Sequence, residues 1–205
     1  MAIGRARGSV VRIWVYVEGT SDKLGLEALF RNETSDWRKR GTSVQLRPLN
    51  GKGNILREVG RHARLALDNG RVDHVFVLVD LYPGHTEAEA LRQELRALIA
   101  PRLRSRFHAH VAVHDFEAWV LAAPEALCGR LGVKHLSGFN SPETVNDQKP
   151  PAEHLKELFA RYNRTYKKNS DGPAILRRTM PAVIADKCSN FRLFYQDLLT
   201  CVAEP

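Results

Sequence analysis

The sequence predicts an α/β fold in which a mostly parallel sheet is flanked by helices and followed by a helical C-terminal portion. Apolar runs of strand length occur at 10–17, 72–80 and 107–114, and the segments between them have the length and periodicity of helices. Strands separated by such helices pair in parallel through right-handed crossovers. Beyond these runs no strand pattern remains, and prolines interrupt helical segments. We therefore expect an α/β core at 1–115 and a helical extension at 116–205, packed together as one compact unit.

Between the apolar runs, capping residues, glycines and prolines indicate where helices begin and end. Thr20 or Ser21 is expected to cap a helix that extends to Phe30, whereas the polar stretch from Trp37 to Gly41 is expected to be a loop. The other predicted elements are a short strand at 43–49, a helix from about 55 to 69, a turn at Pro83 and Gly84, and an amphipathic helix that Pro101 ends.

Acidic residues follow three of the predicted strands. Glu18 and Asp22 come after the first, Asp80 closes the second, and Asp115 and Glu117 come after the third. The carboxyl ends of parallel strands converge on one crevice, where ligands bind. Carboxylates gathered there repel one another unless a cation lies among them. The pattern predicts a hard divalent metal ion, and such an ion beside carboxylates is a common device for handling phosphate.

Most of these acids also have a structural alternative. Asp22 could simply favour the N-terminus of the following helix electrostatically. Asp115 could be an N-cap, because FEAWVLA has a helical pattern, and Glu117 would then lie in the first turn. No capping role explains Glu18. Asp80 ends an apolar strand, where a carboxylate lies either at an active edge or in a costly buried position.

Histidines and a glycine-rich loop are weaker signals of chemistry. His108, His110 and His114 share strand parity, and such an array could bind zinc. The favoured interpretation is that they are separate histidines with ordinary hydrogen-bond partners. The NGKGN loop around Lys52 resembles a phosphate-cradling loop but lacks the spacing of a P-loop. Lys52 is nevertheless a candidate phosphate contact.

The charge of the chain indicates a polyanionic partner. Its 205 residues carry a formal net charge of +8. The basic residues occur in groups at 38–40, 102–106, 161–168 and 177–178. Nucleic acid is the simplest partner for such groups, and the alternative is that each is a solvated helix face or loop end. A basic surface around an acidic, metal-ready crevice favours nucleic-acid processing.

The sequence contains no sign of a membrane segment or of oxidised cysteines. No apolar run approaches the roughly 20 residues of a membrane helix. Arg12 interrupts the N-terminal apolar stretch, so we do not expect a signal peptide. Cys128, Cys188 and Cys201 are odd in number and lack CxxC spacing, which is typical of reduced thiols. A cytoplasmic location is expected.

Together, the acidic motifs resemble the Toprim domain of topoisomerases, bacterial primases and OLD-family nucleases. EGTSD at 18–22 and LVDLYP at 78–83 each follow a strand, as in that domain. The chain is most similar to a small Toprim-clan family with a D-x-Y second motif, often encoded beside an ABC/AAA-type ATPase in bacterial defence islands. HDFEAW at 114–119 matches the EFEA segment of that family. Further matches lie at 142–146, 149–151, 166–168 and 188–191.

The resemblance implies phosphodiester chemistry that depends on Mg²⁺ or Mn²⁺, with two ions. Glu18, Asp22 and Asp80 are the implied metal ligands, and Asp115 and Glu117 would serve the second ion. A lysine, either Lys149 or Lys168, would stabilise charge on the transferring phosphate. The implied catalytic residues are Glu18, Asp80, Glu117, Lys149 and Lys168. The implied phosphate contacts are Lys52, Arg161, Arg164 and Lys167.

One departure from the Toprim pattern leaves two functions open. Tyr82 stands where other Toprim proteins have an aspartate, and losing that carboxylate weakens metal affinity. The first function is a nuclease for DNA or RNA that works with an ATPase partner in anti-phage defence. The second is a non-catalytic nucleic-acid-binding or regulatory subunit of that ATPase. A primase-like transferase and a small-molecule phosphatase rank lower. The chain could also form a homodimer.

Overall fold

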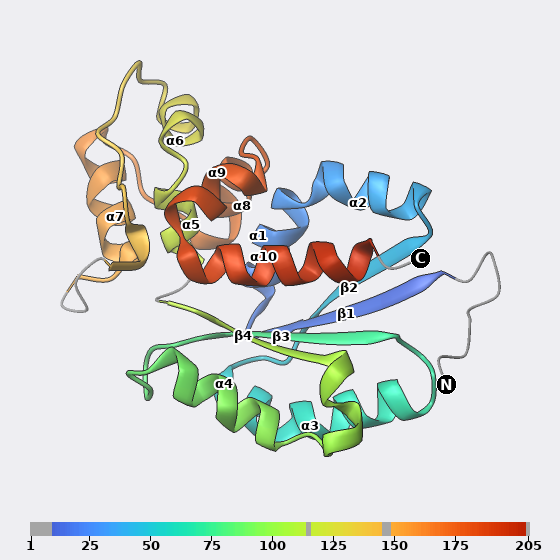
Figure 1. Ribbon diagram of the computed structural model, residues 1–205. Coiled ribbons are helices and arrows are strands. Elements are labelled where there is room, and N and C mark those ends of the chain that lie inside the picture. The colour runs from blue at the N-terminus through green and yellow to red at the C-terminus, as the bar shows by residue number, and fades with distance from the viewer. Residues whose placement is uncertain (1–9, 114–115, 145–148, 204–205) are drawn as a thin grey trace.

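A four-stranded parallel sheet in the order β2-β1-β3-β4 forms the centre of the protein (Figure 1). The computed structural model describes residues 10–113, 116–144 and 149–203. The strands are β1 (Val11–Val17), β2 (Thr42–Pro48), β3 (His74–Asp80) and β4 (Phe107–Ala112). The predicted α/β class, with a parallel sheet flanked by helices, is confirmed.

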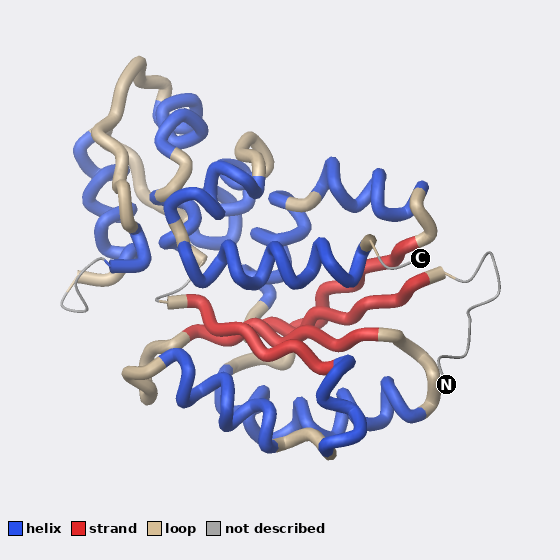
Figure 2. Tube along the Cα trace, in the orientation of Figure 1, coloured by secondary structure: helices blue, strands red, loops and turns tan. Residues whose placement is uncertain are grey.

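Helices cover both faces of the sheet (Figures 1 and 2). One face packs against α3 (Lys52–Asp68) and α4 (Ala88–Ala97), and the other against α1 (Thr20–Leu29), α2 (Arg31–Lys39) and α10 (Ser189–Val202). Because β3 lies between these two layers, every residue of it except Asp80 is buried. This explains why its sequence is continuously apolar instead of alternating.

The C-terminal half forms helices that share a hydrophobic core with the sheet. They are α5 (Glu117–Leu121), α6 (Pro124–Leu131), the 3₁₀ helix η2 (Pro142–Thr144), α7 (Pro151–Arg161), α8 (Lys168–Leu176), α9 (Pro181–Lys187) and α10. Side chains of β1 and of each of these α-helices belong to the same buried cluster. For example, the ring centroids of Trp119 on α5 and Phe191 on α10 lie 4.9 Å apart. The centroid of the Phe194 ring, also on α10, lies 6.1 Å from that of Phe76 on β3. Among the described helices, none combines the length and apolar character of a membrane span.

Three local predictions were wrong. The loop expected from Trp37 to Gly41 begins only at Arg40, because the residues from Trp37 to Lys39 belong to helix α2. The ring of Trp37 is buried, with its centroid 5.5 Å from that of the Phe30 ring. Neither Thr20 nor Ser21 caps α1, because the N-cap is Gly19. The helix expected to reach Pro101 ends at Ala97, and a 3₁₀ helix, η1 (Pro101–Arg106), begins at that proline.

Candidate active site

The carboxyl ends of β1 and β3 bring Glu18 and Asp80 into contact. These strands are neighbours in the sheet, so the residue that follows β1 lies beside the last residue of β3. Oε1 of Glu18 accepts a hydrogen bond of 2.8 Å from the backbone N–H of Asp80. The side chain of Glu18 and the backbone of Asp80 therefore meet at the edge of the sheet where the sequence placed both residues.

Partial burial shapes the chemistry of Glu18. Desolvation raises the pKa of its carboxyl above the ordinary value, and the nearby charge of Asp22 raises it further. The N–H of Asp80, the charge of Lys52 and the N–H of Lys52 act in the opposite direction. Burial and negative charge thus disfavour ionisation of Glu18, and a cation among the oxygens would reverse that effect.

Asp22 stabilises the start of α1. Its Oδ2 accepts a hydrogen bond of 2.7 Å from the backbone N–H of Gly19, so the side chain closes the turn between β1 and the helix. The structural alternative for Asp22 is thus realised. The negative charge of Asp22 also contributes to the raised pKa of Glu18.

Lys52 lies beside the same acids and fastens the loop that follows β3. Its Nζ donates hydrogen bonds to the carbonyl oxygens of Leu81 at 2.6 Å and Pro83 at 2.9 Å. Desolvation lowers the pKa of Lys52, while Glu18 and Asp80 raise it. The preceding Gly51 has φ of 113°, which strongly favours glycine, and its N–H donates to the Glu18 carbonyl. The glycine-rich loop thus places an ammonium group at the carboxylate edge.

Glu117 and Lys168 form an ion pair. Glu117 begins α5, just beyond β4, and has no exposed surface. Lys168 begins α8, and its Nζ lies 3.0 Å from Oε2 of Glu117 while 41% of its side chain is exposed. A buried carboxylate needs such a partner, because removing a charge from water costs several kcal/mol. The lysine reaches from the surface to this buried acid.

Two glycines fix the position of the segment that carries Glu117. A Cβ at Gly172 of α8 would lie 2.7 Å from a ring carbon of Phe116, and one at Gly25 of α1 would lie 3.3 Å from the same ring. The ring of Phe116 therefore occupies space that only glycine leaves free. Neither glycine was singled out from the sequence, because their role depends on three elements that meet only in the folded chain.

The other predicted site residues lie elsewhere or have structural partners. Lys149 pairs with Glu157 of α7 at 2.5 Å. Arg164 donates to the carbonyl of Arg130 at 2.6 Å. The N–H of Lys167 donates to Asp171 at 2.7 Å. Arg161 lines a surface hollow with Lys149. Asp115 and His114 lie outside the described residues.

A basic groove runs between α1 and α8. Its hollow of about 580 Å³ is lined by four arginines, Arg31, Arg130, Arg177 and Arg178. Arg130 also donates from Nε to the buried Asp171 at 2.8 Å, which holds it in place. Asn169 and Ser170 line the same groove, so it begins one residue after Lys168. Of the basic groups noted in the sequence, the pair at 177–178 lines this groove, whereas Arg38, Arg104 and Arg161 each line a different hollow.

Carboxylate oxygens are the ligands that Mg²⁺ and Mn²⁺ prefer. Glu18 and Asp80 supply such oxygens at the carboxyl ends of the neighbouring strands β1 and β3, and Asp22 supplies further ones from the first turn of α1. These residues fit a hard divalent ion. Glu117 offers a further carboxylate, paired with Lys168.

Comparison with known proteins places the chain in a family and supports its fold. A family model described as "Domain of unknown function (DUF4276)" matches residues 17–199. The C-terminal region of the Burkholderia pseudomallei OLD protein is similar, with a TM-score of 0.53 and 16% identity over 94% of this chain and 99% of that one. The corresponding region from Xanthomonas campestris pv. campestris aligns with a TM-score of 0.42 and 16% identity, over 90% and 95%. No curated protein is similar enough in sequence to count as a match.

Proposed function

The chain belongs to the DUF4276 family, and we propose that it is a metal-dependent nuclease that cleaves DNA or RNA. The observation that carries this proposal is the contact between Glu18 and Asp80 at the carboxyl edge of a parallel sheet. The fold of an OLD C-terminal region supports it, because the sequence motifs resemble the Toprim domain of OLD-family nucleases.

In this proposal the carboxylates hold Mg²⁺ or Mn²⁺. Glu18, Asp22 and Asp80 would bind one ion, and Glu117 with Asp115 would bind a second. When bound, the ions supply a nucleophilic water and stabilise charge on the leaving oxygen. The hydrogen bond from Asp80 N–H to Glu18 fixes the orientation of the glutamate before any ligand arrives. The Asp22 cap does the same for its own carboxylate.

The chain's own cations would position the substrate. Lys168 is close enough to the surface for its ammonium group to turn from Glu117 toward a bound phosphate. The arginines of the groove that starts beside it would neutralise neighbouring phosphates along the strand. Lys52 would hold the loop after β3 at the same edge through its two carbonyl contacts.

Binding of Mn²⁺, measured by calorimetry, tests the metal site directly. We expect saturable binding to the wild-type protein and its loss in Asp80→Ala. Asp36→Asn, a charge change on the exposed surface of α2, serves as the control and should bind as the wild type does. Equal binding to wild type and Asp80→Ala would place the metal elsewhere and contradict the proposal.

Tyr82 favours a second function, a non-catalytic nucleic-acid-binding or regulatory subunit of an ATPase. Its ring packs against the apolar cluster under α3 and α4, in the position where Toprim proteins carry a second aspartate. This function predicts salt-sensitive nucleic-acid binding that survives both a chelator and Asp80→Asn. Binding that requires the metal would exclude it.

The partner and the biological role rest on the resemblance alone. We propose that an ABC/AAA-type ATPase encoded nearby binds this chain, and that the pair acts in anti-phage defence. Co-expression of the two proteins, followed by size-exclusion chromatography, tests the association. The same experiment measures whether the chain alone elutes as a homodimer. Separate elution of the two proteins, with and without ATP, would contradict the partnership.

A further inference from the structure

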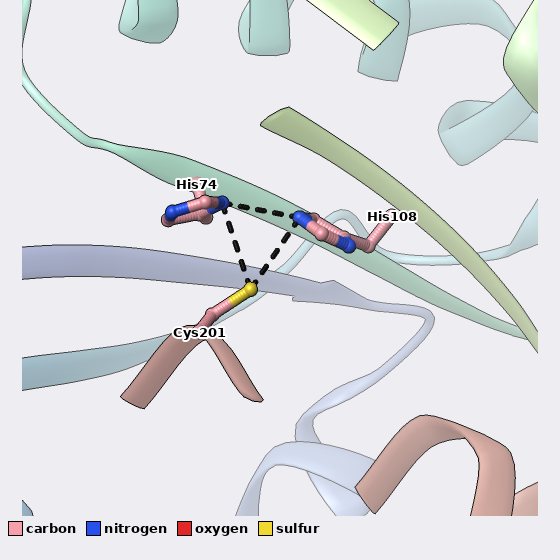
Figure 3. Close-up of side chains that lie close together, drawn as sticks. All are labelled: His74, His108 and Cys201. Atoms are coloured by element: carbon pink, nitrogen blue, oxygen red, sulfur yellow. Dashed lines mark hydrogen bonds between the residues drawn. The ribbon is translucent and has the colours of Figure 1, made fainter. Parts of the chain in front are cut away.

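Three side chains that can bind a metal converge at the opposite end of the sheet from the carboxylates. His74 is the first residue of β3, His108 is the second residue of β4, and Cys201 lies in the last turn of α10 (Figure 3). Nδ1 of His74 lies 3.1 Å from Nε2 of His108, and Sγ of Cys201 lies 3.6 Å from each of these nitrogens. One ligand atom from each residue therefore faces a common point.

These separations match a tetrahedral zinc site. Zinc binds histidine nitrogen at about 2.0–2.1 Å and cysteine sulfur at about 2.3 Å, and tetrahedral angles then place two nitrogens about 3.3 Å apart and sulfur about 3.6 Å from each nitrogen. The distances between sulfur and nitrogen agree with these values without any movement. The two imidazoles need to separate by only a few tenths of an ångström.

Asp197 presents the correct nitrogen of His108 to the site. Its Oδ2 lies 2.9 Å from Nδ1 of His108 and 2.9 Å from Nε2 of His110. A carboxylate accepts from an imidazole N–H, so this contact favours the tautomer in which Nδ1 of His108 carries the proton and Nε2 keeps its lone pair. Carboxylates orient zinc-binding histidines in this way.

Burial and charge are also suitable for an ion. Cys201 is 2% exposed and His74 is 7% exposed, so the site is shielded from solvent. A zinc ion with a cysteine thiolate carries one net positive charge, which the neighbouring Asp197 would balance. Nitrogen and sulfur ligands select zinc over magnesium. A tetrahedral ion bound by these three residues has one position left for water.

We propose that His74, His108 and Cys201 bind one zinc ion that fastens α10 to the sheet. The end of α10 already reaches the amino ends of the strands, because Thr42 at the start of β2 donates to the carbonyl of Val202. His74 and Asp80 are the two ends of β3, so about 20 Å of strand separates this site from the carboxylates. The proposed zinc is therefore independent of the proposed nuclease metal.

Cobalt titration of the whole chain is the direct test, because Co²⁺ replaces zinc and reports its ligands. We expect one equivalent of Co²⁺ to produce the d–d bands of a tetrahedral site and a thiolate-to-metal charge-transfer band. Zinc should displace the cobalt stoichiometrically, and an excess of Mn²⁺ should not. Absence of the charge-transfer band from the folded wild-type protein would overturn the proposal and leave only a hydrogen-bonded cluster.

Variants assign the ligands. Cys201→Ser should remove the charge-transfer band and weaken zinc binding at least about 100-fold, more than the loss of an outer-shell partner. Cys128→Ser changes a cysteine of α6 outside this cluster and should leave the spectrum unchanged. Asp80→Ala should also retain it, which separates this site from the carboxylates. Retention of the band in Cys201→Ser would overturn the assignment, and if that variant does not fold, His108→Ala makes the same test.

Discussion

The two ends of the central sheet carry donor atoms of opposite character. At the carboxyl end, Glu18 and Asp80 offer only oxygen. At the amino end, His74, His108 and Cys201 offer nitrogen and sulfur. Hard cations prefer the first set and zinc prefers the second. If both proposed metals bind, this difference in ligand chemistry would keep a hard cation at the carboxyl end and zinc at the amino end.

The two ends also differ in how the fold assembles them. Glu18 and Asp80 meet because neighbouring parallel strands end side by side, a consequence of the sheet alone. The amino-end cluster needs a residue from the far C-terminal helix, since Cys201 is separated from His74 by the greater part of the chain. The first site depends on strand order, and the second depends on how α10 docks.

The strongest test of the carboxyl end is cleavage of labelled single- and double-stranded DNA and RNA by Asp80→Asn. Outer-shell partners of metal ligands typically contribute about 10- to 100-fold, so loss of a ligand should reduce the rate by at least about 100-fold. The control Cys128→Ser should cleave at the wild-type rate, because Cys128 lies on α6. Equal residual cleavage by wild type and Asp80→Asn would mean a contaminant or a different site.

At the amino end, Asp197→Asn tests the orienting carboxylate without removing a ligand. The asparagine side chain lacks the negative charge with which Asp197 accepts hydrogen bonds from His108 and His110. We therefore expect the affinity for zinc to fall about 10- to 100-fold. Mn²⁺ binding, measured by calorimetry on the same protein, should not change. A parallel loss of both metals would show that the two ends are coupled, contrary to their separation along β3.

The carboxyl end was predictable from sequence because its signal is local. Apolar runs identify β1 and β3, and an acid directly after each run is visible without knowing any contact. The ligand roles of these acids remain predictions. The sequence did not predict helix α2, because the helix has one buried residue, Trp37, and that residue is held by a tertiary contact with Phe30.

The amino-end cluster was not predictable, because its members have no shared spacing. Strand parity grouped His108 with His110, but the ligand atoms group His108 with His74 and Cys201. His110 instead contacts Asp197, as the favoured interpretation of ordinary hydrogen-bonded histidines expected. The cap of α1 was missed for a related reason, since Asp22 bonds back to Gly19 across a turn whose geometry the sequence leaves open.

Gly172→Ala tests how firmly Glu117 is held at the carboxyl end. The added methyl group would overlap the ring of Phe116, and overpacking of this kind costs about 1–3 kcal/mol in the free energy of unfolding. Urea denaturation measures the change. Gly129→Ala is the matched control, because that glycine also lies within a helix but its nearest neighbour would be 3.5 Å away. The control should be neutral or stabilised by about 0.5–1 kcal/mol.

The weakest effect that we predict concerns the basic groove between α1 and α8. Arg177→Ala with Arg178→Ala removes two exposed arginines that line it. If each contacts one phosphate, the slope of log affinity against log salt should become shallower by about 0.9 per contact on double-stranded DNA. Arg61→Ala with Arg64→Ala changes the same number of exposed charges on α3, across the sheet. Equal slopes for the two double variants would mean that net charge alone binds nucleic acid. A change in slope confined to the groove pair would assign nucleic-acid binding to the groove between α1 and α8.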